Sequence, residues 1–105
     1  MKASIEFEPH GDSRLGSVVT NSGFSDWATQ NVPSTLTTVA WKVRRRGSDF
    51  FIDWRPIGGA EWRQMRIATL TEAAAGAEVL VGAYACAPQG PGFVARFRDI
   101  KFECL

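Results

Sequence analysis

The sequence predicts an all-β domain built as an antiparallel two-sheet sandwich. Apolar and polar residues alternate with a period of two in one segment after another, as in strands that bury one face. Turn-forming residues interrupt these segments at short intervals, and no segment keeps a helical apolar stripe for three turns. A chain of 105 residues has room for one core, so we expect a single domain over residues 1–105 with seven or eight strands.

The N-terminal part contains three predicted strands. Residues 2–8 place apolar side chains on one side and polar or charged ones on the other. The next two strands are expected at 15–20 and 24–30, separated by the Asn-Ser-Gly turn at 21–23. These segments have the lengths typical of strands in small sandwiches.

A β-hairpin is predicted over residues 38–56. Trp41 and Val43 alternate with basic residues, and the turn at 47–49 leads into a second alternating segment that contains Trp54. Because the two tryptophans are in register with aliphatic residues, we expect both in the core.

The next predicted strand, 61–69, carries a polar side and a connector follows it. Alternation puts Trp62, Gln64 and Arg66 on one side of this strand. Residues 71–76, TEAAAG, favour helix but are too few for a stable one, so we expect at most a helical turn there.

Two further strands are predicted near the C-terminus. Residues 78–86 are nearly all apolar, which suits a central strand buried on both faces, and 93–104 forms the last strand with a kink at 98–99. If the two strands form a hairpin, Cys86 and Cys104 lie at opposite ends of it, too far apart for a disulfide. We therefore expect reduced thiols.

Charge and hydropathy exclude several classes of partner. The net charge of +1 is too small to attract a polyanion over a distance, so nucleic acid is not expected, although most of the basic residues are arginines. No segment approaches the roughly 18 consecutive apolar residues of a membrane helix. The first residues lack the apolar stretch of a signal peptide, which predicts a cytoplasmic protein.

Four sequence blocks resemble a known family. They are VVTNSGFSDWATQ at 18–30, WKVRRRGSDFFIDW at 41–54, EWRQMRIA at 61–68 and VGAYACAPQGPGFVARFRDIKF at 81–102. They are similar to the uncharacterised lectin-like family that includes the yeast regulator of enolase. The resemblance implies a jelly roll of the concanavalin A-like lectin and glucanase type.

The resemblance also implies a partner. This chain matches the C-terminal part of the family's domain and starts without the strands that precede it in longer members. A jelly roll that lacks strands exposes sheet edges and apolar surface, so we expect a homodimer in which a second copy covers them.

No arrangement of residues predicts catalysis, a metal or a cofactor. His10, the one histidine, lies in a turn, where a solvated side chain is the simpler interpretation than a catalytic base. Glu6 and Glu8 share a strand face but lack the Glu-x-Asp-x-x-Glu pattern of the related glucanases. Neither a zinc ligand set nor a dense calcium loop is present. The protein is therefore not expected to be an enzyme.

A non-catalytic binding role is the remaining prediction, with carbohydrate as the ligand class by fold analogy. The alternative is a protein-interaction or metabolic regulatory module, and a glycosidase-like enzyme is the weakest hypothesis. For the basic run at 44–46, pairing with nearby acids and binding of an anionic ligand both stay open. The expected ligand contacts are exposed aromatic and polar side chains: Trp62, Gln64, Arg66, Asp26, Trp27 and the loop residue Gln89.

Overall fold

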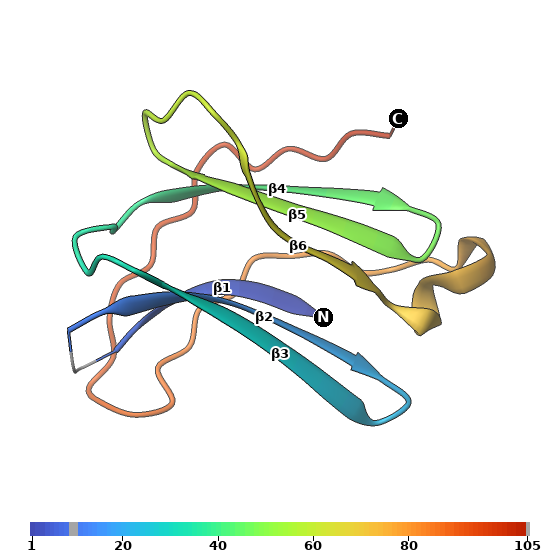
Figure 1. Cartoon of the computed structure of the whole chain (residues 1–105), viewed down its shortest axis with the longest axis horizontal. Helices are drawn as coiled ribbons and strands as arrows, with labels where there is room; N and C mark the ends of the chain where they lie inside the picture. Colours follow the sequence, from blue (N-terminus) through green and yellow to red (C-terminus); the bar gives the residue numbers. More distant parts are fainter. Residues whose placement is uncertain (9–10, 105) are drawn as a thin grey trace.

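The computed structural model describes residues 1–8 and 11–104, and it is a β-sandwich of two three-stranded antiparallel sheets (Figure 1). The strands are β1 (Lys2–Phe7), β2 (Ser13–Asn21), β3 (Phe24–Val32), β4 (Val39–Arg46), β5 (Asp49–Pro56) and β6 (Arg63–Thr69), followed by a 3-10 helix, η1 (Thr71–Gly76). The strands are ordered β1-β2-β3 in one sheet and β4-β5-β6 in the other. The predicted all-β, antiparallel two-sheet fold is confirmed.

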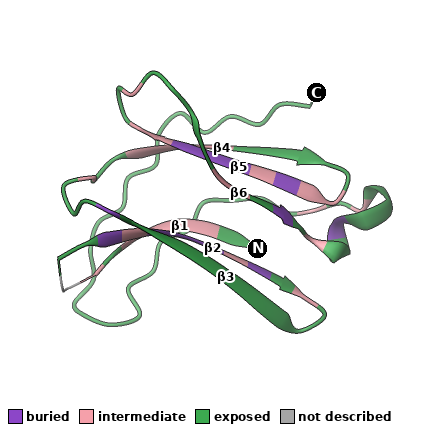
Figure 2. Ribbon diagram, viewed as in Figure 1, coloured by how far each residue is buried: buried purple, intermediate pink, exposed green. Residues whose placement is uncertain are grey.

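The β1–β3 sheet buries alternate residues of its central strand. Ser13, Leu15, Ser17 and Val19 of β2 are all buried, because their shared face looks across the sandwich toward β6. In contrast, β3 is exposed along its whole length except Val32, as Figure 2 shows in green. The second sheet therefore covers the middle of the first and leaves its β3 edge open.

The β4–β6 sheet supplies the other side of the core. The predicted hairpin is confirmed, with Trp41 opposite Trp54 and Val43 opposite Ile52. Ile52 and Trp54 are 1% and 4% exposed. Leu15, Val32 and Trp54 form the buried cluster, and the residues packed against it are Ile5, Leu36, Val39, Trp41 and Met65. The prediction that Trp41 and Trp54 belong to the core is confirmed.

A β-bulge in β6 changes the predicted faces of that strand. Arg66 lies opposite Ile52, but the next pair is Gln64 with Asp53, so Met65 is an extra residue. The bulge puts Arg66 on the inner face with Ile52 and Gln64 on the outer face with Asp53. The prediction that Gln64 and Arg66 share one side is therefore wrong.

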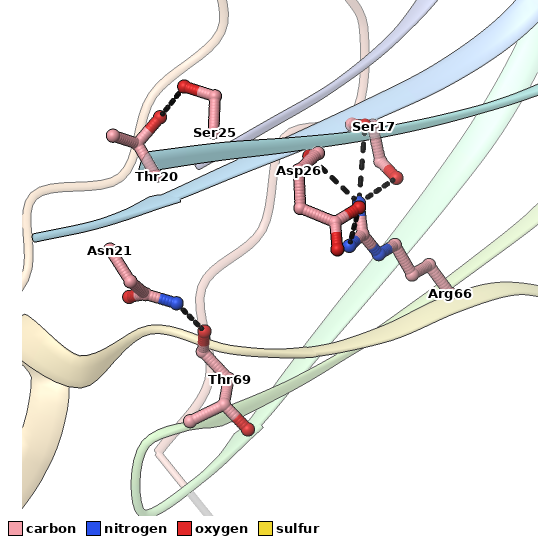
Figure 3. A network of polar contacts seen from close by, with 7 residues as sticks. All are labelled: Ser17, Thr20, Asn21, Ser25, Asp26, Arg66 and Thr69. Atoms are coloured by element: carbon pink, nitrogen blue, oxygen red, sulfur yellow. Dashed lines mark hydrogen bonds and ion pairs between the residues drawn. The ribbon is translucent and has the colours of Figure 1, made fainter. Parts of the chain in front are cut away.

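Asn21 ties the two sheets together at one end. Its side-chain amide donates to the carbonyl of Thr69 at 2.9 Å (Figure 3), and its side-chain oxygen accepts from the backbone N–H of Thr71 at 2.8 Å. The turn that follows it has positive φ at both Ser22 (52°) and Gly23 (80°), as tight hairpins require. The turn residues predicted from the sequence thus also connect the sheets.

The two predicted C-terminal strands are absent. Residues 77–104 contain no strand, and Figure 1 draws them from η1 to the C-terminus as irregular chain. The prediction of a central strand at 78–86, buried on both faces, is therefore wrong, as is the last strand at 93–104. Leu80 is fully exposed at 104%.

The physical reason is that a strand exists only with a partner. Ala75 and Gly76, with φ of 54° and 76°, turn the chain at the end of η1, and the apolar segment that follows does not continue the sheet. The predicted kink occurs as a left-handed Asp99 (φ 56°), but in irregular chain. Periodicity showed the tendency to form strands and could not show whether a neighbour was in place.

The C-terminal segment makes the molecule less compact than a typical domain of its length. The radius of gyration is 14.6 Å, against about 13 Å for a compact domain of this size. Cys86 and Cys104 are both free and exposed, and the predicted hairpin that would hold them apart is absent.

Candidate functional site

A pocket of about 440 Å³ opens where the end of β3 meets the end of β5 and the start of β6. Its lining comes from β3 and the following loop and from the second sheet: Gln30, Asn31, Val32, Pro33, Thr35, Leu36, Trp54, Pro56 and Arg63. The volume is within the range of about 300–1,000 Å³ that is usual for small-ligand sites. We call this cavity the end pocket.

Two proline-containing turns shape the end pocket. Pro33 has no backbone N–H to continue the ladder, so β3 ends at Val32, and the Leu36 N–H then bonds to the Pro33 carbonyl at 2.9 Å. On the opposite wall, the Gly59 N–H bonds to the Pro56 carbonyl at 3.0 Å. The two walls are thus short, hydrogen-bonded turns.

The floor of the end pocket is part of the core. Val32 and Trp54 are 6% and 4% exposed, and Leu36 packs against the same cluster. Side chains packed this closely keep one rotamer, so the floor is preformed. The end pocket therefore needs little reorganisation to accept a ligand.

The rim of the end pocket is polar and carries one charge. The amides of Gln30 and Asn31 can both donate and accept hydrogen bonds, and Thr35 adds a hydroxyl. Arg63 is the one charged side chain of the lining, which contains no carboxylate. The guanidinium of Arg63 lies 5.3 Å from the centre of the Trp54 ring.

A second cavity of about 50 Å³ lies between the sheets, next to Gln30 and Met65. It is large enough for one or two water molecules and too small for a sugar or a peptide side chain. Gln30 lines both cavities and therefore lies next to both the end pocket and the smaller cavity.

Arg66 and Asp26, both predicted ligand contacts, bind each other (Figure 3). The guanidinium of Arg66 reaches across the sandwich and lies 2.8 Å from the Asp26 carboxylate. It also donates to the carbonyl and hydroxyl of Ser17 at 3.3 and 3.2 Å and to the Asp26 carbonyl at 3.3 Å. With its side chain only 15% exposed, Arg66 has a structural role in joining the sheets.

Trp62 and Gln64, two more predicted contacts, lie around the outer face of the β4–β6 sheet. The Lys42 ammonium and the Arg55 guanidinium lie 4.6 and 4.5 Å from the centre of the Trp62 ring. Gln64 is exposed beside Asp53. Cations already lie against the Trp62 ring, which reduces the area that a sugar could stack on.

Trp27 and Gln89 lie elsewhere. Trp27 is 59% exposed and is paired with Val18 on the outer face of the β1–β3 sheet. Gln89 is exposed in the irregular segment after η1. Among the described residues, Arg66 and Asp26 are the only two predicted ligand contacts that an ion pair joins to each other. His10 lies outside the described residues.

Arg44 and Arg45 of the basic run at 44–46 both bind groups within the fold. Arg44 bonds to the buried carboxylate of Asp53 at 2.9 Å, and Lys42 lies 3.7 Å from the same oxygen. Arg45 points the other way and donates to the carbonyls of Ala73 and Ala77 at 2.7 and 2.8 Å, which holds η1 against β4. Of the two interpretations of the basic run, pairing with a nearby acid and binding of an anionic ligand, the first is therefore correct for Arg44.

The described part of the chain contains no group of three His, Cys, Asp or Glu that could hold a metal ion. Its only helix, η1, is far too short and polar to cross a membrane.

Sequence reasoning did not identify the end pocket. Gln30 ends a predicted strand, Asn31 and Thr35 belong to the turn and loop after it, and Arg63 is one basic residue among many. The available signal was the run of polar residues around Pro33, because loops at strand ends commonly carry binding residues. The bulge that orients Arg63 has no sequence signature.

Comparison with curated proteins and with solved structures finds no match. A family model described as "Protein of unknown function (DUF1349)" matches residues 1–104, nearly the whole chain. The chain therefore belongs to the DUF1349 family.

Proposed function

We propose that this chain is a non-catalytic binding module and that a carbohydrate binds in its end pocket. The observation that carries the proposal is the combination of two amides and a hydroxyl at the rim with an apolar, preformed floor. Sugars present the same combination, with hydroxyl groups around a ring whose C–H faces are apolar. The resemblance to concanavalin A-like lectins supports this ligand class by fold analogy.

The end pocket lacks the groups that a glycosidase needs. Hydrolysis uses two carboxyl groups roughly 5–10 Å apart on either side of the bond that breaks. The lining of the end pocket contains no Asp or Glu. The buried acid Asp53 is paired with Arg44 and Lys42 on the outer face of the β4–β6 sheet. A binding role therefore fits the lining better than hydrolysis.

Asn31→Ala is expected to weaken sugar binding about three- to tenfold, as the loss of one hydrogen bond predicts. Backbone amide shifts in NMR titrations with a panel of mono- and disaccharides would locate the site and give the affinity. We expect the perturbed amides at 30–36 and 54–63.

Gln64→Ala is the matched control for Asn31→Ala, because Gln64 is also an exposed amide on a strand but faces the other side of the β4–β6 sheet. It should leave the affinity unchanged. Loss of binding in Gln64→Ala alone would place the ligand near Trp62, as the sequence predicted, and a panel without any shifts would refute carbohydrate binding in the end pocket.

A second candidate function is a protein-interaction or metabolic regulatory module that acts as a homodimer. The irregular C-terminal segment favours it, because the segment exposes large apolar side chains: Leu80, Val81, Tyr84, Phe93, Val94, Phe97, Ile100 and Phe102. β3 also presents an open sheet edge. Exposed apolar side chains and open edges both promote association.

The molecular mass in solution tests this second function. If two copies cover each other's C-terminal segments, light scattering after size exclusion will give about twice the 11.5 kDa of one chain. Phe97→Asp combined with Ile100→Asp should return the protein to a monomer, whereas Glu72→Lys, an exposed charge change in η1, should not. A monomer at every concentration would rule out self-association.

A further inference from the structure

We propose that the carbohydrate held in the end pocket is acidic, with a ring carboxylate that Arg63 binds. This inference rests on the proposed function, and it specifies the chemical class of the ligand. It follows from the charge of the end pocket, the orientation of Arg63 and the groups around it.

The charge of Arg63 is not neutralised within the described chain. The ion pairs there join Asp53 to Lys42 and Arg44, and Asp26 to Arg66, and none includes Arg63. Arg63 is exposed, and the end pocket that it lines contains no acidic side chain. A neutral ligand would leave this charge without a partner, whereas an anionic ligand would supply one.

The fold also orients Arg63. Its register partner is Trp54, and its guanidinium lies 5.3 Å from the centre of that buried ring. The bulge at Met65 keeps Arg63 on the inner face of β6, beside the end pocket. A guanidinium held against a rigid ring loses little entropy when it binds, and its planar fork suits the two oxygens of a carboxylate.

A uronic acid fits all parts of the lining at once. Its carboxylate would pair with Arg63, its hydroxyl groups would bond to Asn31 and Thr35, and a C–H face would lie on the apolar floor. A small free carboxylate would use only the first of these contacts. We therefore expect a small carboxylate without the sugar ring to bind more weakly than the uronic acid.

The test compares the methyl glycoside of galacturonic acid, whose carboxylate is free, with methyl galactoside, which has a neutral CH2OH group in the place of the carboxylate. NMR titration of the whole chain should show galacturonate binding about tenfold more tightly, with a preference that falls as salt rises. Arg63→Gln should remove the preference, because the side chain that replaces Arg63 carries no charge. Arg63→Lys should keep part of the preference, because the charge remains but the fork does not.

Arg46→Gln is the matched control, since Arg46 is exposed on β4 outside the end pocket and carries the same charge. It should leave the preference intact, and an equal loss in Arg46→Gln would overturn the role of Arg63. Equal binding of both sugars to the end pocket would overturn the acidic ligand class and leave the proposed function standing. If neither sugar shifts the amides of the end pocket, the proposed function fails as well.

Discussion

Trp54→Ala is expected to lower the free energy of unfolding by about 3–5 kcal/mol. Trp54 is 4% exposed and lies in the buried cluster with Leu15 and Val32, opposite Trp41 on β4. Removal of the indole leaves a cavity at the point where both sheets meet, and short proline turns on either side restrict collapse into it. A domain of this size has only about 5–15 kcal/mol of stability in total, so the loss is a large fraction of it.

Urea unfolding followed by far-UV circular dichroism measures this effect. Trp27→Ala removes the same side chain from a site that is 59% exposed, and we expect a change of less than about 1 kcal/mol. If Trp54→Ala is unfolded without urea, Ile52→Val gives a measurable loss of about 1 kcal/mol in the same sheet. Equal losses for the two tryptophans would contradict the position of the core.

Arg66→Met is expected to cost about 2 kcal/mol of stability. The substitution keeps the length of the side chain and removes the hydrogen bonds to Ser17 and Asp26 that join the two sheets. Most of the loss should come from Ser17, which is buried and would keep an unpaired hydroxyl. Asp26 is 71% exposed, so water can replace its partner at little cost.

Two controls separate these contributions in the same urea experiment. Asp26→Asn should cost less than about 1 kcal/mol, since the pair that it breaks is screened by solvent. Arg46→Met removes an exposed arginine that forms no ion pair within the described chain and should change stability by less than about 0.5 kcal/mol. A loss for Asp26→Asn as large as that for Arg66→Met would show that the carboxylate, and not Ser17, carries the link.

The candidate site was predicted only in its general character. An exposed tryptophan next to polar residues suggested the outer side of β6, whereas the concave lining lies at the end of the sandwich. Of the predicted contacts, Arg66 and Asp26 are committed to each other across the sheets. The sequence showed that these side chains are polar and could not show that they are already paired.

The sequence alone determined the local features of this protein. Alternation and turn chemistry predicted the strands that became β1 to β6, because both act over a few neighbouring residues. Tertiary structure decided whether each apolar segment found a partner. The bulge at Met65, the pairing of Arg66 with Asp26 and the irregular course of 77–104 all depend on contacts between residues far apart in the chain. A strand can form only where another strand offers it an unpaired edge, and the alternation of apolar and polar residues in a segment does not show whether such an edge is nearby.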